Sequence, residues 1–194
     1  MTDAAGPPGP APDAAGPPGP APDAAPALAR ARELLLEAAA ALRAGGARRE
    51  TLADLVPARR VLGMPRAARM TPIGPVWRLG VLLLDESGRA YATGHVVRAE
   101  RAARKSVTAE AVAQQRAWRA AAVKGGIPEG ETVDFDAPAV DLDELGRVGA
   151  SGPLVLLDDV VLVRWSPAQP EALTPLDAYL RDRVDLLVHP PEGT

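Results

Sequence analysis

Residues 76–98 of this 194-residue chain read VWRLGVLLLDESGRAYATGHVVR and carry its clearest structural pattern. Two apolar segments flank the turn residues DESG at 85–88, and a glycine in such a turn accepts the left-handed conformation that a tight connection needs. We therefore predict a β-hairpin with strands at 76–84 and 89–98. Val and Leu fill every position of 81–84, which indicates a strand that is buried on both faces.

A second hairpin is predicted by the segments LVLL at 154–157 and VVLVRW at 160–165, which two aspartates join. A short further strand is predicted at 132–135. Apolar residues recur at helical spacing in three segments that Gly or Pro residues close. We predict helices at about 24–44, 107–124 and 176–189, a shorter helical piece at 51–55 and a connector without periodicity at 58–75.

These elements predict a single α+β domain over residues 24–194. The two hairpins would form a roughly four-stranded, mainly antiparallel sheet. Because apolar strands need cover on both faces, helices should pack on both sides, or a second copy of the chain should cover one face.

Residues 1–23 have a different composition from the rest of the chain. The decapeptide DAAGPPGPAP at 3–12 is repeated at 13–22. Sequence this rich in Pro and Gly buries too little apolar area to offset the entropy of ordering. We therefore expect a disordered, proline-rich tail before the domain.

The composition excludes several classes of protein. The chain has no cysteine, so it holds no disulfide, no thiolate nucleophile and no cysteine-ligated metal. No apolar run approaches the roughly 18 residues of a membrane helix. The first basic residue is Arg30, so a signal sequence with a charged start is missing. We expect a cytoplasmic protein without membrane association.

Charge is distributed unevenly along the chain. Residues 28–124 hold 18 basic and 8 acidic residues, whereas residues 125–194 hold 4 basic and 14 acidic ones. The simpler interpretation is that the two halves fold against each other. The alternative is a patch in the Arg-rich region 28–124 that binds nucleic acid or another polyanion and includes Arg98, Arg101, Arg104 and Lys105. The net charge of −3 and the six aromatic residues argue against nucleic acid.

His95 and His189 are the two histidines of the chain, so a catalytic triad would need one of them as its base. Tyr91, Thr93 and His95 alternate along the predicted strand, which should direct them to one face. A pocket with these side chains and a nearby carboxylate would suit a small, amidohydrolase-like hydrolase that uses His95. A histidine in a half-buried strand is more often held by a hydroxyl or carbonyl than used in catalysis.

Acidic residues gather within and after the short predicted strand. Asp134, Asp136, Asp141 and Asp143 form two Asp-x-Asp spacings, and carboxylates of this kind bind magnesium or calcium. A calcium loop that starts at Asp141 fails, because leucine and glycine would occupy two of its ligand positions. We interpret the segment as a solvated acidic loop, with a metal site as the alternative. Phosphate-loop and dinucleotide motifs are absent, so we expect no cofactor.

Three stretches carry a resemblance to a known family: PIGPVWRLGVLLLDESGRAYATG at 72–94, SGPLVLLDDVVLVRWSP at 151–167 and VDLLVHPPEGT at 184–194. Together they resemble a small family of uncharacterised actinobacterial proteins, and the resemblance covers most of residues 50–194. Some members are labelled glutaminase. Serine-dependent glutaminases use a Ser-x-x-Lys nucleophile, which none of the serines in this chain begins, so the resemblance implies no catalytic residue.

The absence of recognisable catalytic and cofactor motifs therefore favours a non-catalytic binding or interaction module. The chain has a folded core but no recognisable nucleophile, metal set or phosphate loop. Its partner would be a protein, a small ligand or a second copy of the chain. The His95 hydrolase and the polyanion-binding protein are the two alternatives.

Overall fold

The computed structural model describes residues 24–61, 63–101, 110–166, 168–169 and 171–191. Predictions for the tail at 1–23, for Arg104 and for Lys105 lie outside these residues. The helices are α1 (Ala24–Ala44), α2 (Glu110–Lys124), α3 (Leu142–Val148) and α4 (Leu176–Val188). No helix within the described ranges is long and apolar enough to cross a bilayer.

The strands fall into three sheets. The larger sheet consists of β1 (Glu50–Val56), β4 (Arg69–Leu79), β5 (Leu82–Asp85), β6 (Ala90–Ala92), β7 (His95–Arg98) and β8 (Thr132–Phe135). The smaller sheet consists of β9 (Ala150–Ser151), β10 (Leu154–Leu157), β11 (Val160–Arg164) and β12 (Leu173–Pro175). β2 (Arg59–Val61) and β3 (Met64–Arg66) form a separate two-stranded ribbon. The α+β class is confirmed, but the single four-stranded sheet is wrong.

The larger sheet has the strand order β6-β5-β4-β1-β8-β7. Neighbouring strands run antiparallel except β1 and β8, which are parallel, so the sheet is mixed. The long strand β4 pairs with β1 along its first part and with β5 along its last part. One face is covered by α2, which contributes Ala121 and Ala122 to a core around Phe135.

The end of α2 lies directly on the backbone of β4. A Cβ at Gly125 would overlap the carbonyl of Met70. Glycine at this position therefore permits a close approach of helix and strand that any larger side chain would prevent.

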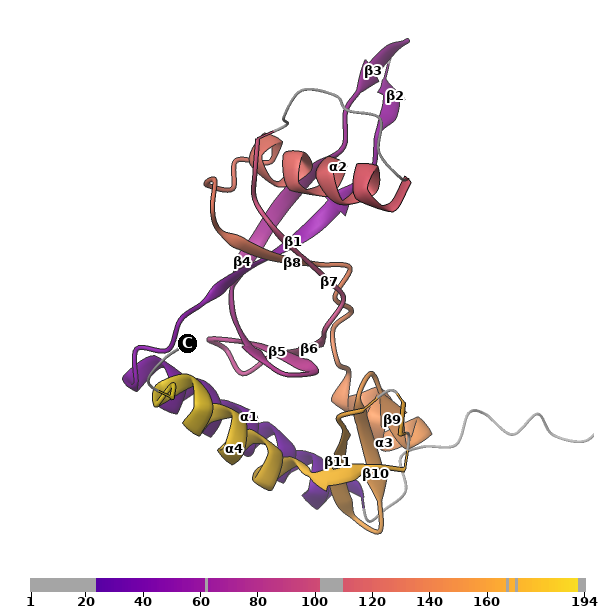
Figure 1. Ribbon diagram of the computed structural model, residues 1–194. Helices are drawn as coiled ribbons and strands as arrows, with labels where there is room; N and C mark the ends of the chain where they lie inside the picture. Colours follow the sequence, from indigo (N-terminus) through magenta and orange to yellow (C-terminus); the bar gives the residue numbers. More distant parts are fainter. Residues whose placement is uncertain (1–23, 62, 102–109, 167, 170, 192–194) are drawn as a thin grey trace, which may run out of the picture.

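Both predicted strands of the first hairpin are divided: 76–84 into the end of β4 and β5, and 89–98 into β6 and β7. β6 and β7 are separated in the chain by Thr93 and Gly94, yet they form opposite edges of the sheet. The sheet therefore curls, as Figure 1 shows. Gly94 lies against the backbone carbonyls of Phe135 and Asp136, where a Cβ would clash.

The second predicted hairpin is confirmed as β10 and β11. Asp158 and Asp159 connect these strands with positive φ angles of 45° and 59°, the conformation of a two-residue hairpin turn. This hairpin belongs to the smaller sheet, so the two predicted hairpins do not share one sheet. Its turn end is open to solvent, because Leu157 and Val160 are each almost half exposed.

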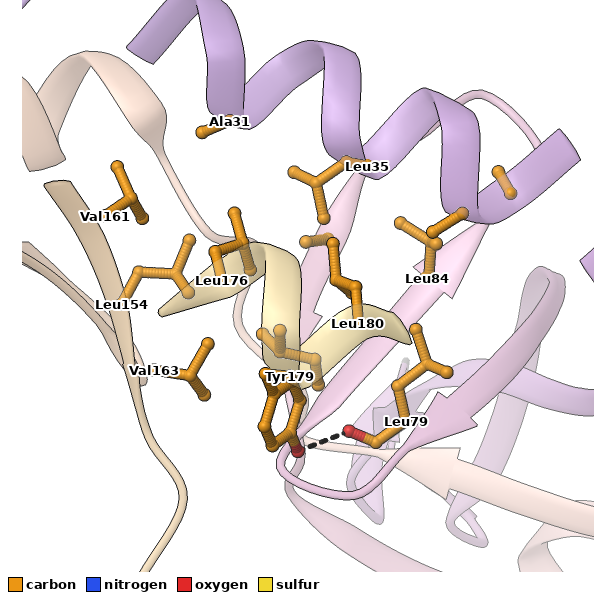
Figure 2. Packing of buried hydrophobic residues seen from close by; sticks show 14 of the residues in the cluster. Ala31, Leu35, Leu79, Leu84, Leu154, Val161, Val163, Leu176, Tyr179 and Leu180 are labelled. Atoms are coloured by element: carbon orange, nitrogen blue, oxygen red, sulfur yellow. Dashed lines mark hydrogen bonds between the residues drawn. The ribbon is translucent and has the colours of Figure 1, made fainter. Parts of the chain in front are cut away.

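The largest hydrophobic core lies between α1, α4 and the two sheets (Figure 2). Leu35 of α1, Leu84 of β5 and Leu180 of α4 point toward one another there. Burying a leucine side chain of this kind contributes roughly 1.5–3 kcal/mol. The predicted burial of residues 82–84 is confirmed, since Leu82 and Leu84 face this core and Leu83 faces the opposite side of the sheet.

Two further predictions are wrong. The segment at 51–55, predicted as helical, is part of β1, which lies between β4 and β8. The segment at 58–75, predicted as a connector, contains β2, β3 and the first part of β4. In both segments the hydrogen-bond partners come from other strands, and this pairing outweighs the weak local preferences of the sequence.

Candidate functional site

A groove of about 530 Å³ lies between α1 and α4 on the face of these helices that the sheets leave uncovered. Apolar side chains form its floor. On α1 they are Leu34, Ala38 and Ala41, and on α4 they are Leu180, Val184 and Val188. We call this hollow the α1–α4 groove.

The two helices that form the α1–α4 groove run side by side in the same direction (Figure 1). The first turn of α4, at Leu176, lies beside Ala27 and Ala31 of α1. At the other end, Val188 packs on Gly45, which directly follows α1 and leaves no room for a Cβ. The helices are therefore parallel neighbours.

Charged side chains line the two ends of the α1–α4 groove. Arg30, Asp177 and Arg181 lie toward the end where the helices begin, and Asp185 and His189 lie toward the end where they finish. Glu37 lines the groove between them. Arg30 contacts Glu33 and Glu37 at 3.2 Å each, and these hydrogen bonds raise the pKa of Arg30.

The remaining rim residues also form pairs within α4. Arg181 lies 3.3 Å from Asp177, and the Nδ1 atom of His189 lies 3.0 Å from Asp185. The backbone N–H of His189 donates to the Asp185 carbonyl at 2.8 Å and so closes the helix. His189 thus closes the helix through its backbone, and its side chain pairs with Asp185.

The groove arises because each helix is apolar over more than its core-facing stripe. On α1, Leu28, Leu35 and Leu42 are buried in the core, while the groove residue Leu34 lies one position before this stripe. A stripe wider than one helix face predicts contact with two partners instead of one.

His95 and Tyr91, which the sequence placed on one face, lie apart in the structure. They belong to strands at opposite edges of the larger sheet. The His95 ring packs against Trp118 and Phe135, with ring centroids 4.9 Å and 5.4 Å away. Within the described part of the chain, no carboxylate pairs with His95. Thr93 lies in the connection between the two strands.

Tyr91 packs on the opposite face of the sheet from α2, beside Leu52, Val76 and Leu83. Its hydroxyl lies 3.4 Å from Asp85 Oδ2, and burial raises the pKa of the Tyr91 phenol. A small hollow of about 250 Å³ opens beside Tyr91 and Asp85. This hollow does not contain His95, so the residues of the proposed hydrolase site do not line one pocket.

Asp134 is fully buried in β8, on the same side of the sheet as Tyr91, where it forms an ion pair with Arg78. The Nε atom of Arg78 also donates to Glu50 Oε2 at 3.0 Å. The second carboxylate oxygen of Asp134 has no hydrogen-bond partner among the described residues. The Arg78 guanidinium therefore joins three strands, β1, β4 and β8, by charge-assisted contacts.

The other acidic candidates lie apart from Asp134. Asp136 follows β8 with a positive φ of 53°. Asp141 caps α3, and Asp143 contacts Arg32 of α1 at 2.6 Å. Among the described residues, no three acidic or histidine side chains come together as metal ligands. The segment predicted as an acidic loop contains a short helix, α3.

The predicted polyanion patch is described in part. Arg98 is exposed at the end of β7, and Arg101 contacts Glu129 at 3.2 Å. Arg104 and Lys105 belong to the residues that are not described. Nucleic-acid binding at this patch therefore stays a prediction.

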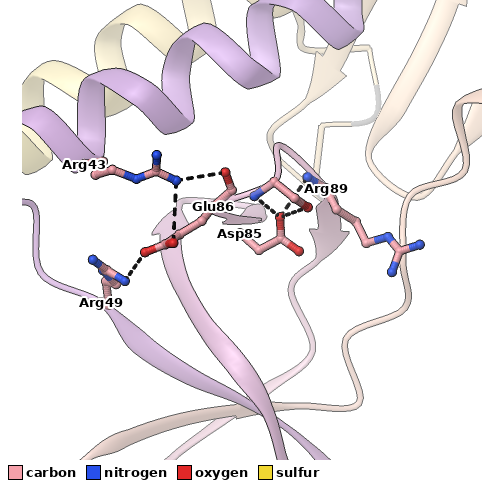
Figure 3. Close-up of polar contacts among 6 residues, drawn as sticks. Arg43, Arg49, Asp85, Glu86 and Arg89 are labelled. Atoms are coloured by element: carbon pink, nitrogen blue, oxygen red, sulfur yellow. Dashed lines mark hydrogen bonds and ion pairs between the residues drawn. The ribbon is translucent and has the colours of Figure 1, made fainter.

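The turn between β5 and β6 is held by a second charged network (Figure 3). The Asp85 carboxylate accepts from the backbone N–H groups of Ser87 and Arg89 at 2.8 Å and 3.0 Å. Glu86 forms ion pairs with Arg43 and Arg49. This network anchors the turn to the end of α1, so these charged residues have a structural role.

We compared the chain with protein families, curated proteins and solved structures, and none of the three comparisons gives a match. The resemblance to an actinobacterial family therefore stays a prediction. Any function has to be inferred from the geometry of the chain itself.

Sequence reasoning missed the α1–α4 groove because neither helix is unusual alone. The signal was present in Leu34 and Ala38 on α1 and in Val184 on α4. These side chains face one another because the two helices pack in parallel. A pattern within one segment does not predict this packing.

Proposed function

We propose that this chain is a non-catalytic interaction module whose α1–α4 groove binds a second copy of the chain. The observation that carries the proposal is the apolar floor of the groove, whose rim carries Arg30 toward one end and Asp185 toward the other. Protein surfaces that bind a partner helix typically combine such an apolar groove with a charged rim.

Charge complementarity favours a second copy as the occupant. A two-fold axis across the groove makes the helices of the two copies antiparallel. Arg30 then faces Asp185 of the other copy, and the symmetry makes this contact of opposite charges occur twice. Arg181 and Asp177, at the same end as Arg30, already pair within one copy.

Helix dipoles support the same arrangement. Parallel helices place their partial positive charges at one end of the pair and their partial negative charges at the other. A second pair in antiparallel orientation brings opposite ends together, which lowers the electrostatic energy of all four helices. The apolar floor residues, including Val184, would lose their contact with water in the same step.

A charge-swap experiment tests this proposal. Arg30→Asp leaves an acid at both contact positions, 30 and 185, and Asp185→Arg leaves a base at both. Like charges then meet in each homodimer, whereas a heterodimer of the two variants pairs opposite charges at both contacts. We expect the dissociation constant of each variant alone to rise about tenfold or more, and the equimolar mixture to recover wild-type affinity. Analytical ultracentrifugation measures both.

Leu186→Asp provides a matched control. Leu186 is 45% exposed on α4 but does not line the groove, so this variant should dimerise like the wild type, whereas Val184→Asp should not. Circular dichroism establishes that each variant is folded. A monomeric wild-type chain at all accessible concentrations, or a mixture that stays as weak as its components, would overturn the proposal.

A further inference from the structure

The β2–β3 ribbon extends the β1–β4 pair beyond the edge of the larger sheet and past α2 (Figure 1). The last pair in the sheet is Val56 with Arg69, and the ribbon continues with Arg59 opposite Arg66. We call residues 57–61 and 63–68 the arm. At about 3.3 Å per residue, an arm of this length reaches roughly 20 Å from the sheet.

The charges of the arm all have one sign. Arg59, Arg60 and Arg66 lie on it and Arg69 lies at its base, and all four are exposed. Residues 57–70 contain no Asp or Glu. Within the described residues these arginines form no ion pair, whereas Arg30, Arg101 and Arg119 elsewhere on the surface do.

Arg59 and Arg66 are directly opposite each other in the ribbon. Cβ atoms in such a pair are about 5 Å apart, and like charges at this distance destabilise a sheet. A two-stranded ribbon is itself only marginally stable in water. The arm therefore carries a repulsion that nothing in the described residues offsets, and an anionic partner would remove it.

We propose that the arm binds duplex DNA by inserting into the major groove. That groove is about 12 Å wide and admits a two-stranded β-ribbon, while the guanidinium groups of Arg59 and Arg66 contact the phosphates on its edge. Met64 near the end of the arm is 71% exposed, and an apolar contact of this kind suits the methyl group of thymine. A-form RNA is a poorer fit, because its major groove is deep and narrow.

The net charge of −3 does not prevent this interaction. The acidic excess lies in residues 125–194, and the screening length at physiological ionic strength is about 8 Å. An arm that extends farther than this length from the sheet presents its own charge to DNA. Local charge at the arm therefore outweighs the net charge of the chain.

Fluorescence anisotropy with a labelled 20-base-pair DNA duplex tests the proposal. We compare the wild type with Arg59→Ala/Arg66→Ala over a series of salt concentrations. Loss of two phosphate contacts should weaken binding about tenfold or more at low salt and reduce the salt slope by about 2. Arg59→Lys/Arg66→Lys, which keeps the charges, should retain most of the salt dependence.

The control double variant is Arg48→Ala/Arg147→Ala. Both residues are exposed and lie outside the arm, so the net charge changes equally while the affinity should stay within about twofold of the wild type. The arm variant should also melt no lower than the wild type, because it removes a repulsive pair. No binding by the wild type at low salt, an equal loss in the control, or equal affinity for an RNA duplex of the same sequence would overturn the proposal.

Discussion

Tyr179 joins the helical layer to the larger sheet through its hydroxyl group. The hydroxyl donates to the Leu79 carbonyl at 2.6 Å and accepts from the Val81 N–H at 2.9 Å. These groups flank Gly80, where the chain turns between β4 and β5 with φ of 65°. Burial raises the pKa of Tyr179, so the hydroxyl keeps its proton and its donor role well above neutral pH.

We expect Tyr179→Phe to lower the free energy of unfolding by about 1–3 kcal/mol, because two partly buried backbone groups lose their partner. Urea denaturation measures the change. Tyr91→Phe is the matched control, since its hydroxyl contacts Asp85 only at 3.4 Å and should contribute less. Equal losses in the two variants would contradict the role that we assign to Tyr179.

Asp134 and Arg78 form an ion pair in which the carboxylate has no exposed surface. Asp134→Ala leaves the guanidinium partly buried without this partner and should cost about 3–5 kcal/mol of unfolding free energy. The double variant Asp134→Leu/Arg78→Leu removes both charges of this pair and should recover part of the loss, less the contact of Arg78 with Glu50, as chemical denaturation can establish. Additive effects of Asp134→Leu and Arg78→Leu would show that the pair does not act as a unit.

At the level of single elements, α3 depends on capping because it has only seven residues. The Asp141 carboxylate accepts from the N–H groups of Asp143 and Glu144 at 2.8 Å and 3.0 Å. These backbone hydrogen bonds, the one from Glu144 foremost, lower the pKa of Asp141 below its ordinary value of 3.8. Gly149 closes the other end of α3 with φ of 83°.

The stabilisation by Asp141 should therefore depend on pH. Because the folded-state pKa is lowered, the contribution is complete above the unfolded-state pKa and is lost as the pH falls through the folded-state pKa. We expect Asp141→Ala to melt lower than the wild type at neutral pH, and the difference to shrink in acid. Asp141→Asn also caps a helix but does not titrate, so its capping should not change with pH. A wild-type-minus-Ala difference in melting temperature that stays constant into acid would contradict this mechanism.

At the level of the whole molecule, the two proposed interfaces lie at opposite ends. The α1–α4 groove lies at one end and the arm at the other (Figure 1). Changes in one should leave the other unaffected, since sites with no shared partners act additively. Failure of DNA binding would therefore leave the dimer proposal in place, and the reverse holds as well.

The two halves of the chain also interact less simply than their charges suggested. Arg32 of α1 contacts Asp143 of α3, which joins the basic and acidic halves as expected. The Asp134–Arg78 pair joins them again within the larger sheet. The arginines of the arm, by contrast, form no ion pair with the residues that the structure describes.

Elements whose pattern is complete within one segment could be predicted from the sequence alone. The apolar stripes of α1 and α4 and the β10–β11 hairpin were predictable, because helical spacing and a two-residue turn are local properties. Burial on both faces was also predictable for Leu83 and its neighbours, since an uninterrupted apolar run has no face for water.

Which segments meet depends on the fold as a whole. β1 and β8 are parallel neighbours although β2–β7 and α2 lie between them in the chain. β6 and β7 lie at opposite edges of the sheet although they are consecutive in the chain. The α1–α4 groove and the arm arise from such pairings. Their residues are ordinary within each segment, because strand pairing and helix packing depend on contacts between distant parts of the chain that local propensity does not encode.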